Sequence, residues 1–261
     1  HPATRDLVTG TEEEVADPTR EKAACLESIT VRCLLTETLE SAKAVFKPEL
    51  RDWALGEILV AQARAGLGPE AMDTAGKIRD PRLIIVALRD IAEAQAASGL
   101  SEKALAAADI ISDPVKRAEA LAAIADIQVR RGDLQGAKTT ADHLIESINN
   151  ISEPLAQVSF QAQAAVIFAH AGNGRQAADI LNATESFARK KIDAGNLGVA
   201  LRHIAKAFGE TEQLAQALNI LSDVRDDSNR TPVLIAAATK QAIAGDAAAA
   251  LATANTIEAV R

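Results

Sequence analysis

A proline and a glycine each recur at a fixed interval of 33 residues in the first half of the chain, and no other feature limits the possible fold as strongly. The repeating positions are Pro48, Pro81 and Pro114, and Gly66, Gly99 and Gly132. A constant period of about 20 to 50 residues is typical of a solenoid, in which each unit packs only against its neighbours. The sequence therefore predicts an array of repeated units.

The composition indicates that these units are helical. Apolar residues make up 48% of the 261 residues, many of them alanine, whereas aromatic residues are only 2%. Alanine has the highest helix propensity, and β-branched alternation typical of strands is scarce. Asp80-Pro81 and Asp113-Pro114 each supply an N-cap side chain followed by proline at the first helical position. We therefore expect an all-α protein.

Each unit contains two predicted helices. In the fourth unit, apolar and small residues recur at helical spacing up to about Arg131, Gly132-Asp133 interrupts the pattern, and a second helix begins by about Gln135. In the second helices two alanines four residues apart share one face and form a shallow groove for the first helix. They are Ala71 and Ala75, Ala104 and Ala108, and Ala137 and Ala141.

The later units keep the register but lengthen. The units are expected to begin near Asp17, Lys47, Asp80, Asp113, Glu153, Asn196 and Asn229. Two of the steps between equivalent turn residues, Gly132 to Gly172 and Gly172 to Glu212, are 40 residues, and the additional seven equal about two helical turns. This predicts longer second helices in units four and five, extended around 142–150 and 185–194. Residues 1–16 are expected to form a polar N-terminal arm, and 17–261 a single solenoid domain.

The recurring pattern L-x-x-I-A-x-x-Q, then G, then A-x-x-x-A, then P resembles the tetratricopeptide repeat (TPR), a helix-turn-helix unit of about 34 residues. The fourth unit carries it at Leu121, Ile124, Ala125, Gln128, Gly132, Ala137, Ala141 and Pro154. The match is degenerate, because Leu and Gln stand where the family usually has Trp and Tyr. The resemblance implies a right-handed α-solenoid of about seven antiparallel helix-turn-helix repeats, a TPR-like superhelix.

Charge and motifs exclude several classes of function. The net charge of −8 makes a nucleic-acid partner improbable, and no run of 18 apolar residues exists to span a membrane. No phosphate-binding glycine loop, zinc-protease motif or nucleophile elbow is present, so we expect no enzymatic activity, no cofactor and no metal. His170 and His203 lie in adjacent first helices. We expect them to be partly exposed groove residues rather than an acid–base or metal pair.

The cysteines bear on the cellular compartment. Cys25 and Cys33 are expected in one helix, where a rise of about 1.5 Å per residue separates them by about 12 Å, too far for a disulfide. Two reduced, buried thiols favour the cytoplasm without excluding the periplasm. The chain begins at His1 rather than Met, so we expect the true N-terminus to be missing from this sequence.

A column of glutamines stands where the family usually places a packing aromatic residue, at Gln62, Gln95, Gln128 and Gln241. Two interpretations remain open. These amides lie in the helix interface and form hydrogen bonds there, or they present a polar strip to a ligand. Buried amides require partners in either case.

The resemblance further implies that a ligand lies in a concave groove lined by the first helices. Carried over to this chain, the partner-binding residues are Arg89, Asp90, Glu93, Asp126, Arg130, His170, Arg202, His203 and Lys206, with apolar contact from Val60, Val129 and Val166. The alternative is an ordinary solvated, charged face. The carboxylate clamp of chaperone-binding members is doubtful, because its asparagine positions hold Val60, Glu93, Asp126 and Val166.

These features predict a non-enzymatic protein–protein interaction module that binds a peptide or helix of a partner in the groove. The alternative is a structural or self-assembling scaffold. It rests on the apolar stretch 247–252 near the end of the array, whose outer side, including Leu251, has no polar cap. A homo-oligomer would then form through the uncapped ends.

Overall fold

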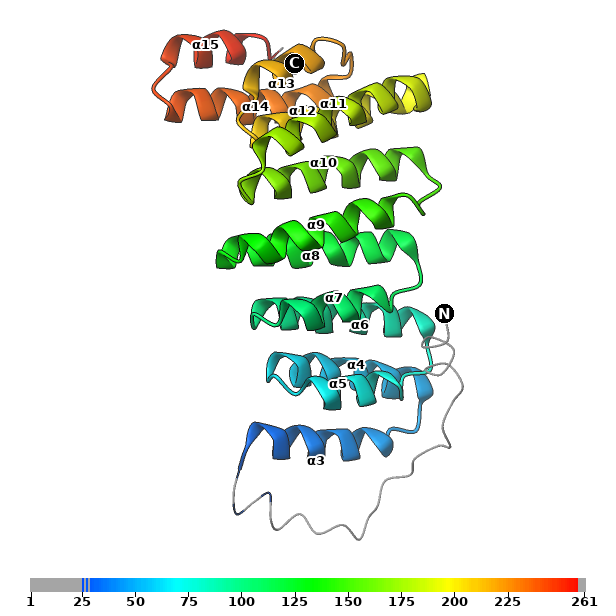
Figure 1. Ribbon diagram of the computed structural model, residues 1–261. Helices are drawn as coiled ribbons and strands as arrows, with labels where there is room; N and C mark the ends of the chain where they lie inside the picture. The colour runs from blue at the N-terminus through cyan, green and yellow to red at the C-terminus, as the bar shows by residue number, and fades with distance from the viewer. Residues whose placement is uncertain (1–24, 26, 28, 258–261) are drawn as a thin grey trace. The chain divides into compact units, whose positions relative to one another are not determined.

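The structure is a computed structural model that describes residues 25, 27 and 29–257. These residues form helices joined by turns, with no strand among them (Figure 1). The helices are α3 (Val31–Lys43), α4 (Pro48–Arg64), α5 (Gly68–Ala75), α6 (Pro81–Ala97), α7 (Ser101–Asp109), α8 (Pro114–Arg131), α9 (Leu134–Ile148), α10 (Pro154–His170), α11 (Gly174–Lys191), α12 (Ala194–Glu210), α13 (Leu214–Leu221), α14 (Asp227–Ile243) and α15 (Ala247–Asn255). The predicted all-α class is confirmed.

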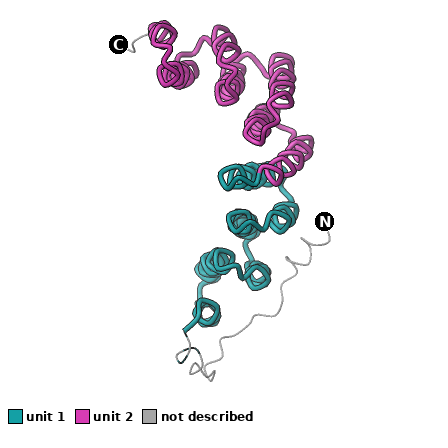
Figure 2. The backbone as a smooth tube through the Cα atoms, turned by 60° about the vertical axis from the view of Figure 1, so that its left-hand side comes forward, with its two compact units in different colours: residues 1–133 teal, residues 134–261 magenta. Residues whose placement is uncertain are grey.

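The chain divides into two compact units, residues 1–133 and residues 134–261 (Figure 2). In the first unit, α4 packs against α5 and α6, and α6 packs against α7 and α8. In the second unit, α10 packs against α9, α11 and α12, α12 against α13 and α14, and α14 against α15. Within these units, α4, α6, α10, α12 and α14 each contact their own second helix and at least one neighbouring first helix, which is the arrangement of a TPR-like helical repeat. That 17–261 form one domain stays a prediction, and the arm at 1–16 lies outside the described residues.

The helix starts follow from the capping residues that the sequence indicated. The Asp80 carboxylate accepts a hydrogen bond from the backbone N–H of Arg82, and that of Asp113 accepts one from Lys116. Asp193 and Asp226 cap α12 and α14 in the same way, although no proline follows them. Units six and seven therefore begin about three residues before the predicted Asn196 and Asn229.

The lengthened second helices are confirmed. Helix α9 has 15 residues and α11 has 18, whereas α5, α7, α13 and α15 have eight or nine. The additional residues are at the C-terminal ends, where the 40-residue steps placed them. Helix α11 ends at Lys191, slightly before the predicted limit, because the chain becomes extended at Ile192.

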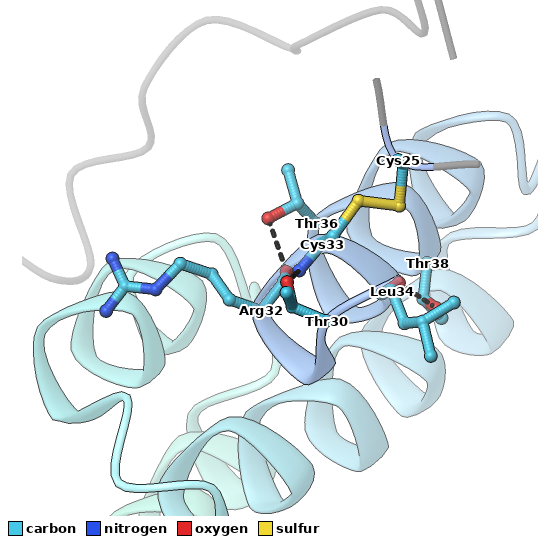
Figure 3. Close-up of a disulfide and its surroundings, with 7 residues drawn as sticks. All are labelled: Cys25, Thr30, Arg32, Cys33, Leu34, Thr36 and Thr38. Atoms are coloured by element: carbon cyan, nitrogen blue, oxygen red, sulfur yellow. Dashed lines mark hydrogen bonds between the residues drawn. A yellow bond between two sulfur atoms is a disulfide. The ribbon is translucent and has the colours of Figure 1, made fainter. Parts of the chain in front are cut away.

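The prediction that the two cysteines are reduced is wrong. Cys25 and Cys33 form a disulfide, with their Cα atoms 5.6 Å apart (Figure 3). One helix does not run through both residues, because Ile29 and Thr30 are not helical and α3 begins at Val31. The Thr30 hydroxyl accepts a hydrogen bond from the Cys33 N–H at 3.1 Å and caps α3. Disulfides persist mainly in oxidising compartments, so the argument for a cytoplasmic location no longer holds.

We predict that the denatured chain shows no reactive thiol before reduction and both of its cysteines as thiols after reduction. A colorimetric thiol titration in denaturant, with and without prior treatment by a phosphine reductant, measures this directly. Two reactive thiols before reduction, in protein purified without reductant, would restore the interpretation of two buried, reduced cysteines.

The turns between paired helices require a left-handed backbone residue, and one unit departs from glycine there. Gly66, Gly99, Gly132, Gly172 and Gly245 have φ between 74° and 85°. The equivalent residue of the sixth unit is Glu212, at φ 62°, the one non-glycine residue with positive φ in the described chain. A residue with a side chain destabilises the folded state by about 1 to 2 kcal/mol when its backbone is left-handed. Because Glu212 is exposed, burial of its side chain does not offset this strain.

We predict that Glu212→Gly raises the free energy of unfolding by about 0.5 to 1 kcal/mol, because relief of the left-handed strain exceeds the greater entropy of an unfolded glycine. Urea unfolding followed by circular dichroism measures the change. Glu146→Gly, at an exposed right-handed position in α9, serves as the control and should destabilise. Equal losses in both variants would contradict the prediction.

Candidate binding surface

The glutamine column lies mainly in the helix interface. Gln62, Gln95 and Gln128 are buried, with exposed fractions of 3%, 7% and 0%. The Gln62 Oε1 accepts a hydrogen bond of 2.8 Å from the Thr74 hydroxyl, which joins α4 to α5 within one repeat. This geometry favours the structural interpretation of these amides over a polar strip that faces a ligand.

The Thr74 hydroxyl that donates to Gln62 stands 12 residues further along, on the second helix, whereas the Gln241 Oε1 accepts no hydrogen bond from a described residue, although Thr253 stands at the same spacing. Thr74 follows Gln62 at this spacing, Thr140 follows Gln128 and Thr253 follows Gln241, but Ala107 follows Gln95. Alanine has no hydroxyl, and the buried Gln95 Oε1 has no hydrogen-bond partner among the described residues. In units five and six the amide is replaced by Phe168 and Phe208, followed 12 residues later by Ile180 and Ile220.

We predict that Ala107→Thr stabilises the protein by about 1 kcal/mol, because the new hydroxyl can donate to Gln95 as Thr74 donates to Gln62. Ala107→Val is the matched control, since valine has the shape of threonine without the hydroxyl. Chemical unfolding of the two variants side by side gives the difference. A valine variant as stable as the threonine variant would show that the hydrogen bond does not form.

The hollows of the first unit lie between its first helices. One, of about 330 Å³, is lined by residues of α4, α6 and α8 and by the C-cap of α6, and we call it the acidic hollow. Its lining residues are Val60, Arg64, Asp90, Glu93, Ala94, Ala97, Ser98 and Ile127. A second hollow, of about 370 Å³, lies toward the start of α6 and α8, and Arg82, Arg89, Lys116 and Glu119 line it.

Arg89 connects the acidic residues of this face. Its guanidinium donates to the Asp90 carboxylate at 3.1 Å and lies 3.6 Å from the Glu93 carboxylate. Partial burial raises the pKa of Glu93, Arg89 opposes that shift and the Asp90 charge adds to it. Arg89 thus contacts both carboxylates from within the same helix, and Arg64 of α4 adds a second cation to the lining.

The second unit has a hollow of about 350 Å³ between α12 and α14, which we call the basic hollow. Arg202, His203 and Lys206 come from α12 and Lys240 from α14, and one carboxylate, Glu210, joins them. The apolar part of the wall is made by Leu214, Pro232, Val233, Ala236 and Ala237, with Gly209 at the end of α12. Burial lowers the pKa of His203, and the neighbouring charges of Arg202 and Lys206 lower it further.

The predicted partner-binding residues do not all share these hollows. Asp90 and Glu93 line the acidic hollow, Arg89 lines its neighbour, and Arg202, His203 and Lys206 line the basic hollow. Asp126 and Arg130 are exposed and form an ion pair with each other. His170 is exposed at the C-terminal end of α10. Unlike His203, it does not line the basic hollow.

Sequence analysis missed several charged lining residues, among them Arg64 and Lys240. Arg64 is in the last turn of α4, and Lys240 is in the seventh unit, whose first helix contributed no residue to the predicted groove. Lys240 directly precedes Gln241 as Ile127 directly precedes Gln128, so the two residues share one register in the repeat, and Ile127 also lines a hollow. Extending the predicted groove positions to every unit finds Arg64, which has the register of Arg130, but it does not find Lys240.

Two searches of the described residues bear on other kinds of site. They contain no group of three or more His, Cys, Asp or Glu residues placed to hold a metal ion. Among the same residues, no helix combines the length and the apolar character needed to cross a membrane.

Comparison with known proteins adds structural likeness only. No protein-family model matches the sequence, and no curated protein matches it. Two solved structures of TPR-like repeats assigned to a kinesin light chain of Podosopora anserina are 13% identical to this chain. The alignments cover 79% of it and 95% and 96% of those chains, with a TM-score of 0.42. Ton1535 of Thermococcus onnurineus NA1 is 15% identical, with 91% of this chain and 94% of that chain covered and a TM-score of 0.29.

Proposed function

We propose that the chain is a non-enzymatic interaction module that binds a peptide or a helix of a partner protein on the outer faces of its first helices. The observation that carries this proposal is the position of the hollows. The acidic hollow lies between α4, α6 and α8, its neighbour lies between α6 and α8, and the basic hollow lies between α12 and α14.

The packing explains why these faces are free to bind. A first helix uses one side for its own second helix and two flanks for the neighbouring first helices. Its remaining side carries half-exposed or exposed residues such as Asp90, Glu93 and Lys206. Repeat arrays create extended binding surfaces from such sides, because successive units present equivalent positions at regular intervals.

The chemistry of the hollows suits a polypeptide ligand. Each combines charged groups at the rim with small or branched apolar residues, such as Val60 and Ile127 in the first unit and Leu214 and Val233 in the second. A partner side chain can therefore bury apolar area while its neighbours form ion pairs at the rim. The charged rim determines which partner binds more than it determines how tightly the partner binds.

A second candidate function is self-assembly through the last repeat. Ile243 and Leu251 expose 81% and 63% of their surface, and Ile235 exposes 52%. The residue one unit earlier in the register of Leu251 is Leu218, which is only partly exposed. An apolar face of this kind, covered in the preceding unit, can pack against a further helical repeat or another copy of the chain.

We predict that the double variant Glu93→Lys, Lys206→Glu lowers recovery of a partner about tenfold, because it reverses one rim charge in each unit. Tagged protein is incubated with extract of the source cells, and bound proteins are quantified by mass spectrometry. Lys103→Glu, Glu146→Lys is the matched control, with the same charge changes on exposed positions of second helices. A partner set unchanged by the groove variant would contradict the proposal.

The same variants separate the two candidate functions. Under self-assembly, the groove variant leaves the molar mass unchanged, and Leu251→Glu lowers it, because a charge is placed on the exposed apolar face. Light scattering coupled to size-exclusion chromatography measures the molar mass of both variants. Under the interaction proposal, Leu251→Glu retains the partners that the groove variant loses.

A further inference from the structure

The basic hollow carries positive charge that the protein itself does not neutralise. Lys206 lies 3.6 Å from the Glu210 carboxylate, the one acidic group in the lining. The Lys240 ammonium donates to the backbone carbonyl of Gly209 at 2.7 Å, a contact that leaves its charge in place. Arg202 has no ion-pair partner among the residues that the structure describes. The hollow therefore has an excess of cations over its single carboxylate.

Apolar groups lie beside these cations. Val233 and Ala237 are buried at 5% and 2% exposure and belong to the side of α14 that faces α12. Pro232, next to them in α14, is exposed and lines the same space. Leu214, at the start of α13, completes the apolar part. A ligand that carried charge alone would leave this apolar surface in contact with water.

From this arrangement we infer that the basic hollow binds an acidic segment of a partner protein that places one apolar side chain between two or more carboxylates. The inference rests on the proposed function, because it names the partner chemistry of one of the surfaces proposed above. The volume of about 350 Å³ admits an apolar side chain and the carboxylates beside it, rather than the whole face of a helix. Guanidinium groups bind carboxylates through paired hydrogen bonds, which gives Arg202 the central role.

The charge on this face distinguishes it from the acidic hollow of the first unit. There, Arg89 contacts both Asp90 and Glu93, so the protein supplies the counter-ion for its own carboxylates. In the basic hollow, Glu210 can counter at most one of Arg202, Lys206 and Lys240. A partner must supply the missing negative charge. A nucleic-acid backbone is the less suitable source, since the chain as a whole carries a net charge of −8.

His203 makes binding depend on pH. The charged or titratable groups around it in the hollow are Arg202, Lys206 and Glu210 of α12 and Lys240 of α14, and Leu214 is the contribution of α13. Burial and the adjacent cations lower the pKa of its imidazole, which is therefore neutral at pH 7. A bound carboxylate offsets the cations and raises the pKa of His203, so binding takes up a proton and strengthens as the pH falls.

The test uses the full chain and a fluorescein-labelled twelve-residue peptide with three glutamates around one central leucine, followed by fluorescence anisotropy. Two control peptides replace the glutamates with glutamine or the leucine with serine. We expect the parent peptide to bind about tenfold more tightly than either control, and more tightly at pH 6 than at pH 8. Both control peptides binding as tightly as the parent peptide, or no binding by any peptide, would overturn the inference.

The protein variants assign the effect to this hollow. Arg202→Gln, Lys206→Gln should weaken binding of the parent peptide about tenfold. Arg175→Gln, Lys190→Gln removes the same charge from exposed positions of α11 and should leave binding unchanged. His203→Gln should remove most of the pH dependence. An equal loss in the α11 variant would overturn the inference, because it would show a general charge effect.

Failure of this inference is distinguishable from failure of the proposed function. If the acidic peptide does not bind but the Glu93→Lys, Lys206→Glu variant still loses its cellular partner, the interaction module stands and the assigned partner chemistry is wrong. If that variant keeps every partner, the proposed function itself fails.

Discussion

The close approach of paired helices through alanine is the constraint on which the rest of the structure depends. Ala104 and Ala108 of α7, Ala177 of α11 and Ala217 of α13 are fully buried, each on the side of a second helix that packs against its first helix. A larger residue at such a position forces the helices apart and costs about 1 to 3 kcal/mol. Since the second helix occupies one side of first helices such as α6 and α12, their opposite side stays open, and the hollows between first helices exist for this reason.

The amide position shows how the same array satisfies a buried site by two different chemistries. A glutamine in the first helix needs a donor within reach, and Thr74 supplies it for Gln62. Phe168 and Phe208, at the equivalent position, are buried instead with large apolar neighbours in their repeats. Gln95 follows neither solution, because Ala107 stands opposite it and its Oε1 has no hydrogen-bond partner among the described residues, which is a cost for a buried polar atom. The exchange from amide to phenyl does not follow helix length, since Gln128 belongs to the unit with the long α9 and Phe208 to the unit with the short α13.

The sequence predicted the repeat boundaries well where local chemistry decides them. Proline after aspartate placed the starts of α6 and α8, and a glycine placed each turn that needs positive φ except that of the sixth unit, where Glu212 stands. The starts of α12 and α14 were missed by about three residues, because Asp193 and Asp226 cap without a following proline. The disulfide was missed because the helical pattern was continued through Thr30, although threonine before an apolar run is itself a helix-start signal.

The candidate site was predictable only in part, because periodicity assigns a residue to a face but does not show which charges neutralise each other. Asp126 and Arg130 are four residues apart on α8, and they pair on the surface without lining a hollow. Arg89 pairs with both acids beside it, whereas Arg202 has no such partner in the described part of the chain. A charge already paired within the protein gains little from a ligand, since the ligand must first displace the internal partner. The unneutralised cations of α12 and α14, rather than the greater number of charged residues on α6 and α8, therefore decide where a charged ligand gains most.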